Sequence, residues 1–89
     1  MTDINTSKGP QNLTTQELII MADEHISHYD NLISMSEINP NVRVGECSSL
    51  IRTWRAVKQA ALNGLTYSDL KPWPAMRSEI ADAYWDSVS

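Results

Sequence analysis

Residues 14–36 read TTQELIIMADEHISHYDNLISMS, and this stretch decides the fold. Thr14 followed three residues later by Glu17 is the signature of a capping box, in which each side chain accepts from the other residue's backbone N–H at a helix start. From Leu18 onward, core-type residues recur at intervals of three and four, which places them on one broad helical face. That face comprises Leu18, Ile19, Ala22, His25, Ile26, Tyr29, Leu32 and Ile33. The pattern predicts a helix over residues 15–36.

A second helix is predicted after the turn signal Asn39-Pro40-Asn41, because proline disfavours helix in the residue before it and asparagine tolerates a tight reversal. This helix should begin near Gly45 and end at Asn63-Gly64, since glycine adopts the left-handed conformation of a helix C-cap. Its buried stripe comprises Cys47, Leu50, Ile51, Trp54, Val57 and Ala61. Two long helices joined by a short turn are expected to pack as an antiparallel hairpin.

The rest of the chain predicts a third, shorter helix. Thr66–Leu70 is typical of a capped single turn, and Lys71–Pro74 is typical of a rigid corner that cannot remain helical. The last helix should start near Pro74 and bury one face, formed by Met76, Ile80, Ala83 and Tyr84. The predicted fold is therefore all-α, an antiparallel two-helix hairpin plus a shorter C-terminal helix.

Residues 1–13 lack helical periodicity and are rich in Thr, Asn, Ser, Gly and Pro. We expect them to form a flexible N-terminal arm, followed by a single helical domain over residues 14–89. No apolar run approaches the roughly 20 residues that a membrane span needs, and the first residues lack the features of a secretory signal. We therefore expect no membrane partner and a cytoplasmic location, which is the host cytoplasm if a phage encodes the protein.

The net charge of −4 conceals three segments of alternating sign. Residues 1–37 carry −5, residues 38–65 carry +3 and residues 66–89 carry −2 when histidine is counted as neutral. Such alternation favours helices that lie beside oppositely charged neighbours, although an exposed ion pair contributes only about 0–1 kcal/mol. We therefore expect the charge pattern to determine which helices lie side by side, and to add little to the stability of the fold.

Trp85 is the leading candidate for a partner-binding residue, because helical geometry turns it nearly opposite to the predicted buried face of the last helix. Ala81 and Val88 accompany it on that helix. Ile20 projects from the outer face of the first helix and extends the patch if the two surfaces adjoin. Since tryptophan often anchors interfaces, we expect these four residues to contact a protein partner or a second copy of the chain.

The outer face of the second helix is a different candidate surface. Arg52, Arg55 and Lys58 could bind an anionic ligand such as a nucleotide signal or a nucleic acid, with Arg43 nearby. Trp54 adds no base-stacking platform, because it lies in the predicted buried stripe. An isoelectric point of about 4.9 makes general affinity for nucleic acid unfavourable. Binding of an anionic ligand is therefore the alternative function.

No catalytic or metal site emerges from the residue pattern. His25 and His28 stand three residues apart on the first helix, but one lies at the edge of the apolar face and the other turns toward solvent. Cys47 is the single cysteine and belongs to the buried stripe, so an internal disulfide is excluded. The sequence contains no glycine-rich phosphate loop. We expect no cofactor, no metal and no enzymatic activity.

These observations favour a non-enzymatic protein-interaction module, either bound to a larger protein or assembled as a homo-oligomer, because large apolar side chains remain outside the predicted core. A mimic of DNA would need far more negative charge than −4. In its length and its lack of catalytic motifs, the chain is similar to the small accessory proteins of bacteriophages and other mobile elements. That similarity, which no motif carries, implies a protein that inhibits or assembles with a larger complex.

Overall fold

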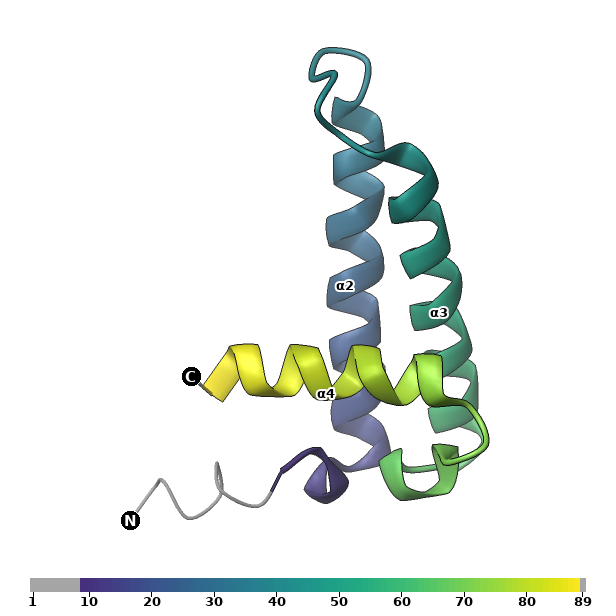
Figure 1. The fold of residues 1–89 in the computed structure, drawn as a ribbon. Coiled ribbons are helices and arrows are strands. Elements are labelled where there is room, and N and C mark those ends of the chain that lie inside the picture. The colour runs from purple at the N-terminus through teal and green to yellow at the C-terminus, as the bar shows by residue number, and fades with distance from the viewer. Residues whose placement is uncertain (1–8, 89) are drawn as a thin grey trace.

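The part of the chain that the structure describes is built from helices. The computed structural model describes the backbone of residues 9–88 and the side chains of residues 9–87. In chain order the elements are the 3₁₀ turn η1 (Pro10–Asn12), helix α2 (Thr15–Met35), helix α3 (Val44–Leu62), the 3₁₀ turn η2 (Tyr67–Leu70) and helix α4 (Pro74–Val88). Helices α2 and α3 form an antiparallel hairpin. Helix α4 crosses this hairpin close to the end that lies away from the turn joining α2 to α3 (Figure 1). The predicted all-α fold is confirmed.

Helix α2 begins at the capping box that the sequence predicts. The backbone N–H of Thr14 donates to Glu17 Oε1 (2.8 Å), and the N–H of Glu17 donates to Thr14 Oγ1 (3.1 Å). These two bonds satisfy backbone donors that the first helical turn leaves unpaired. Leu13 and Leu18, on either side of the cap, both pack into the core. The cap therefore sets the start of α2 and the direction from which the chain enters it.

The two ends of α3 also follow their local signals. In the connecting turn, which we call the tip of the hairpin (residues 36–43), the N–H of Asn41 donates to the side-chain oxygen of Asn39 (3.0 Å). At the other end, which we call the base, Gly64 has a φ of 87°. This conformation lets the N–H groups of Gly64 and Leu65 donate to carbonyls of the last helical turn. Glycine thus terminates α3 and releases the chain toward η2.

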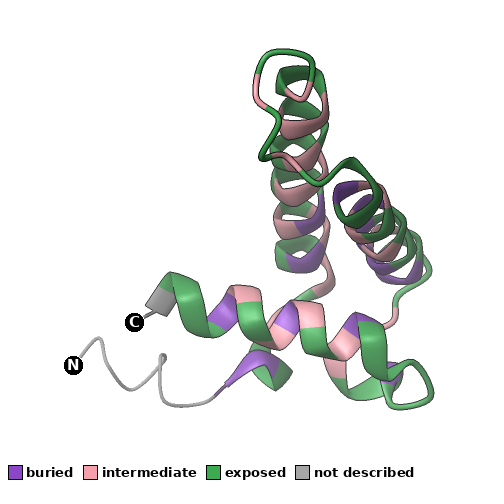
Figure 2. Cartoon of the chain, turned by 45° about the horizontal axis from the view of Figure 1, so that its top comes forward, coloured by how far each residue is buried: buried purple, intermediate pink, exposed green. Residues whose placement is uncertain are grey.

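The core lies at the base of the hairpin, where α4 meets α3 and both 3₁₀ turns. Its largest fully buried side chains are Trp54, Leu18, Leu70, Ile80 and Val57. On α2, the buried positions are confined to the basal end, at Leu18 and Ala22 (Figure 2). Burial of α2 therefore decreases toward the tip, because α4 covers only the basal part of the hairpin.

The expected pairing between oppositely charged segments is found across the hairpin. The ammonium group of Lys58 on α3 lies 2.7 Å from a carboxylate oxygen of Asp23 on α2. Both side chains are partly exposed, so the pair contributes little to stability but favours the observed register of the two helices.

The turn η2 positions a core residue that the sequence pattern did not predict. The Asp69 carboxylate accepts from the backbone N–H of Thr66 (2.9 Å) and from its hydroxyl (3.0 Å). These hydrogen bonds, the backbone one first, hold the pKa of Asp69 below its ordinary value. The cap closes the turn and leaves Leu70 fully buried between α3 and α4.

Residues 9–13, which the sequence pattern assigned to the flexible arm, are structured. Gly9 has a φ of 85° and leads into η1, whose first residue, Pro10, is buried. The turn η1 packs against α4 and η2, and Leu13 packs on the core. The remainder of the predicted arm, residues 1–8, lies outside the described residues. Residues 9–13 have no helical periodicity of their own, and their contacts with α4 and η2 give them a defined position.

Candidate functional site

The structure describes the side chains of three of the four predicted partner-binding residues. Trp85 is 46% exposed, and its ring packs edge-on against Tyr84 at 5.1 Å between centroids. Ala81 is half-buried and lines a separate hollow beside Arg77. Ile20 is 53% exposed on α2. The side chain of Val88 lies outside the described residues.

The predicted basic surface is partly engaged within the chain. Lys58 pairs with Asp23, and the guanidinium of Arg43 lies 3.6 Å from Glu46. Arg52 and Arg55 are exposed on the outer side of α3. Two of the four cations proposed to hold an anionic ligand thus already have carboxylate partners, which weakens the positive potential that such a ligand needs.

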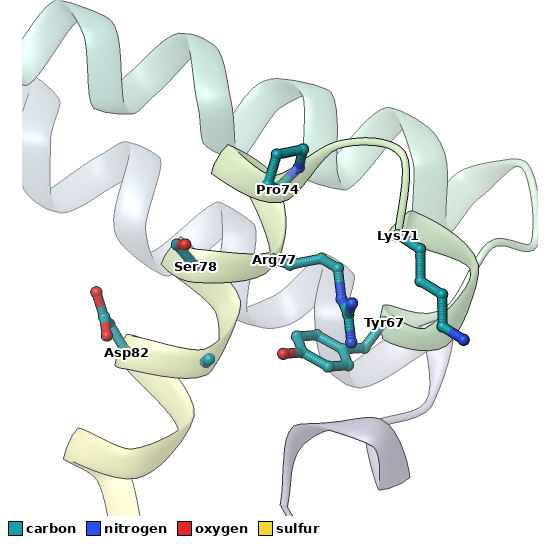
Figure 3. Close-up of a pocket in the computed structure, with 7 residues that line it drawn as sticks. Tyr67, Lys71, Pro74, Arg77, Ser78 and Asp82 are labelled. Carbon is teal, nitrogen blue, oxygen red and sulfur yellow. The ribbon is translucent and has the colours of Figure 1, made fainter.

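A hollow of about 420 Å³ lies between η2 and the first turns of α4 (Figure 3). The guanidinium of Arg77 lies 4.3 Å from the centroid of the Tyr67 ring, a cation–π contact that joins α4 to η2. Lys71 extends away from this pair, and Asp82 lies at the other end of the hollow (Figure 3). The two cations therefore do not converge on one point, and the contact is best explained as a link between elements.

A more extensive depression runs along the hairpin above α4. It consists of two adjoining hollows of about 270 Å³ and 420 Å³ that share Tyr29, Glu46 and Leu50. We call it the corner groove, because it follows the angle between the hairpin and α4 and then continues toward the tip. Its lining residues are His25, Tyr29, Leu32, Asn39, Asn41, Val42, Arg43, Glu46, Cys47, Leu50, Glu79, Asp82, Ala83 and Asp86.

The floor of the corner groove is the continuation of the two apolar helix stripes beyond the reach of α4. Leu18 and Ala22 near the base are fully buried, whereas Tyr29 and Leu32, about two and three turns beyond Ala22 on the same face, are only half-buried. Leu50 on α3 is half-buried as well. The same periodicity that builds the core thus leaves apolar surface uncovered in the upper part of the hairpin.

The side of the groove formed by α4 is acidic. Glu79, Asp82 and Asp86 follow one another at intervals of three and four, so they share one face of the helix. Glu46 adds a carboxylate from α3. Burial, then the charge of Glu79 and smaller contributions from Cys47 and Glu46, raise the pKa of the Tyr29 phenol above its ordinary value. Negative potential therefore reaches the apolar floor.

His25 and His28 do not converge as a metal site would require. The ring of His25 stacks on Trp54 at 4.3 Å between centroids, and its Nδ1 donates to the carbonyl of Met21 (2.8 Å). His28 instead packs edge-on against Tyr29. Among the described residues, no three metal-ligating side chains gather at one place. Both histidines therefore act as aromatic packing groups around the hairpin.

Exposed apolar side chains also occur at the two ends of the hairpin. Met35, Ile38 and Val44 surround the tip, and Ile38 is 83% exposed. At the base, Leu62 is exposed and Trp73 forms one wall of an apolar hollow of about 350 Å³. Sequence reasoning did not identify these residues, and it did not place the acidic face of α4 (Glu79, Asp82 and Asp86) beside an apolar groove.

Comparison with models of known protein families, with curated proteins and with solved structures finds no significant match to this chain. Within residues 9–88, no helix is both long enough and apolar enough to cross a membrane.

Proposed function

We propose that this chain is a non-enzymatic protein-interaction module that works by occupying a surface of a larger protein. The observation that carries the proposal is the corner groove, where Tyr29, Leu32 and Leu50 remain half-exposed on a hairpin whose basal part contains the buried core. An apolar depression rimmed by polar groups is typical of a protein-binding surface. The exposed side chains Trp73 and Trp85 provide further apolar anchors.

The alternative, a binder of a nucleotide signal or nucleic acid through the basic face of α3, has weaker support. Lys58 and Arg43 are paired with carboxylates, which leaves Arg52 and Arg55 as the cations of that set that form no ion pair within the described residues. Nucleic acid binding depends on several phosphate contacts, each of which adds to the salt dependence. Two exposed arginines on an acidic protein are a small basis for such binding.

The size of the chain suits an accessory protein of a bacteriophage or another mobile element that inhibits or assembles with a larger complex. Such a protein needs a stable scaffold and one complementary surface, and it needs no catalytic group. A helical hairpin with a crossing helix supplies the scaffold. Homo-oligomers remain part of this proposal, because the same apolar surfaces can contact a second copy.

Affinity capture from a nuclease-treated lysate of the cells that naturally produce the protein tests this function. The wild type is compared with Trp73→Ala, Trp85→Ala and the charge-reversed pair Glu79→Lys with Asp82→Lys. We expect a protein that stays bound as salt rises from about 0.1 M to about 0.5 M, and whose retention at least one variant abolishes. Retention of nucleotide or nucleic acid alone, with a steep loss in salt, would establish the alternative instead.

A further inference from the structure

The corner groove has the shape of a bundle that lacks one helix. Tyr29 and Leu32 on α2 face Leu50 and Cys47 on α3 across the same depression. In the basal part of the hairpin, the corresponding positions are covered by α4. Above α4, the apolar surface continues to the tip, where Val42 also lines it. A helix laid along this depression would cover the exposed stripe in the way that helices of a bundle cover one another.

The charges around the groove specify which helix fits. Glu79, Asp82 and Glu46 line it, and the only arginine or lysine among its described lining residues, Arg43, is paired with Glu46. An acidic helix would bring like charges together, whereas lysines and arginines flanking an apolar stripe would meet carboxylates. Burial is the main cause of the raised pKa of Tyr29, and the nearby charge of Glu79 adds to it. A basic amphipathic helix can therefore place its apolar face on the floor of the groove and its cations beside the carboxylates of the rim.

A second copy of the chain fits this surface less well. A two-fold symmetric contact of groove against groove would bring two predominantly acidic rims together. A contact between the groove and the exposed Arg52 and Arg55 would join different surfaces, and such contacts extend into rings or filaments. Charge complementarity thus selects a partner with its own basic helix.

We propose, resting on the function proposed above, that the corner groove binds a basic amphipathic helix of a partner protein, with its apolar face on Tyr29, Leu32 and Leu50 and its cations against Glu79 and Asp82. The binding mode is a helix in a groove, read by apolar residues at intervals of three and four. The uncovered part of α2 from Tyr29 to Met35 spans about 9 Å, so it can contact about two turns of the partner helix.

A pair of designed peptides tests the proposal by fluorescence anisotropy. The first is a labelled amphipathic helix with leucine on one face and lysine on the other. The second keeps the leucines and replaces every lysine with glutamate. We expect the leucine/lysine peptide to bind at least tenfold more tightly than the leucine/glutamate peptide. Equal affinities would remove the role of the acidic rim and overturn the proposal.

Matched charge reversals separate the groove from the general acidity of the chain. Glu79→Lys with Asp82→Lys reverses the rim, and Glu24→Lys with Asp30→Lys makes the same change in net charge at exposed positions outside the groove. The rim variant should weaken binding of the leucine/lysine peptide at least tenfold, and the control variant less than about threefold, with circular dichroism showing that both fold. Equal losses in the two variants would contradict binding in the groove.

The floor is tested with Leu50→Ala and mapped by amide chemical shifts. The leucine/lysine peptide should shift the resonances of Tyr29, Leu50 and Ala83, and Leu50→Ala should weaken its binding several-fold. Shifts centred on Trp73 would place the peptide on the other apolar hollow and overturn the proposal.

Sedimentation of the chain alone tests whether a second copy occupies the groove instead. If the chain forms a dimer that the rim variant dissociates, the groove binds a second copy and the proposal is overturned.

The failure of this inference is distinguishable from failure of the proposed function. If the captured cellular partner is lost with Trp73→Ala or Trp85→Ala but retained by the rim variant, the protein is an interaction module and the groove is not its docking site. If neither the wild type nor any variant retains a protein, the proposed function itself is wrong. Loss of the partner with the rim variant alone supports both proposals.

Discussion

At the scale of single residues, Trp54 joins the two hairpin helices. It is fully buried on α3, and the ring of His25 from α2 stacks on it. Its indole N–H has no hydrogen-bond partner among the described residues, so its contribution to stability comes from packing. Ile26 and Tyr29, which lie on the predicted buried face of the first helix, pack against the same core cluster.

Replacing Trp54 by alanine should lower the free energy of unfolding by about 3–5 kcal/mol, because a large buried ring leaves a cavity. This is a large part of the stability of a domain of this size. Thermal or urea denaturation monitored by circular dichroism measures the loss. A loss below about 1 kcal/mol would be incompatible with a buried Trp54 at the centre of the core.

Trp85→Ala should weaken association with a partner while leaving the folding stability nearly unchanged. Since Trp85 is about half exposed and packs on Tyr84 only at its edge, the substitution should cost less than about 1 kcal/mol of folding stability. If Trp85 anchors the interface, binding of the captured partner should weaken at least tenfold, which corresponds to about 1.4 kcal/mol. Equal association constants for the two proteins, measured by calorimetry, would exclude Trp85 from the interface.

The ionisation of Tyr29 provides a pH test of the groove. Its pKa is raised in the folded chain, so the folded state keeps this proton at a pH where the unfolded chain has lost it. The associated stability is fully present below the ordinary tyrosine value of 10.0 and is lost as pH rises through the folded pKa. Glu79→Gln should move the Tyr29 pKa down toward the ordinary value, and Glu24→Gln should not.

Ultraviolet absorbance titration of phenolate measures this change, with Tyr29→Phe identifying which transition belongs to Tyr29. If Glu79→Gln left that transition where it is in the wild type, the carboxylate would not act on the groove floor. The same titration gives the pH limit within which peptide binding to the groove can be compared between variants.

At the scale of elements, local caps determine where the helices begin and end. Thr14→Ala removes the hydroxyl that accepts from the N–H of Glu17, and it should reduce stability by about 1 kcal/mol. Gln16→Ala, at an exposed position in the same turn, is the matched control and should change stability by less than about 0.5 kcal/mol. Similar melting temperatures for the two variants would show that the cap does not stabilise α2.

The helix boundaries and the buried faces of the three helices were predictable, because capping boxes, glycine C-caps and apolar periodicity act within a few residues. The position of η1 was not predictable in this way. Gly9 and Pro10 are typical of a loop, and only their contacts with α4 and η2 give them an ordered place. The burial of Leu70 likewise depends on where η2 lies relative to α3 and α4.

At the scale of the whole molecule, η1 links the N-terminal segment to the far end of the chain. Deleting residues 1–12 removes η1 with its buried Pro10, whereas deleting residues 1–8 leaves it in place. The longer deletion should therefore be less stable than the shorter one by about 1–2 kcal/mol while keeping the hairpin helices, as judged by thermal melts and circular dichroism. Identical melting temperatures for the two truncations would show that η1 contributes nothing to the packing of α4.

The amino-acid sequence by itself determined the hairpin, the third helix and the residues available to form a core, because these follow from interactions between near neighbours in the chain. It did not determine how far α4 reaches along the hairpin. That position depends on contacts between distant segments, such as Ile80 with the cluster around Trp54. Only the tertiary structure decided that Tyr29 and Leu50 stay uncovered and that the acidic side of α4 faces them. The helical periodicity of a sequence shows which residues share a face, but it does not show which element will cover that face.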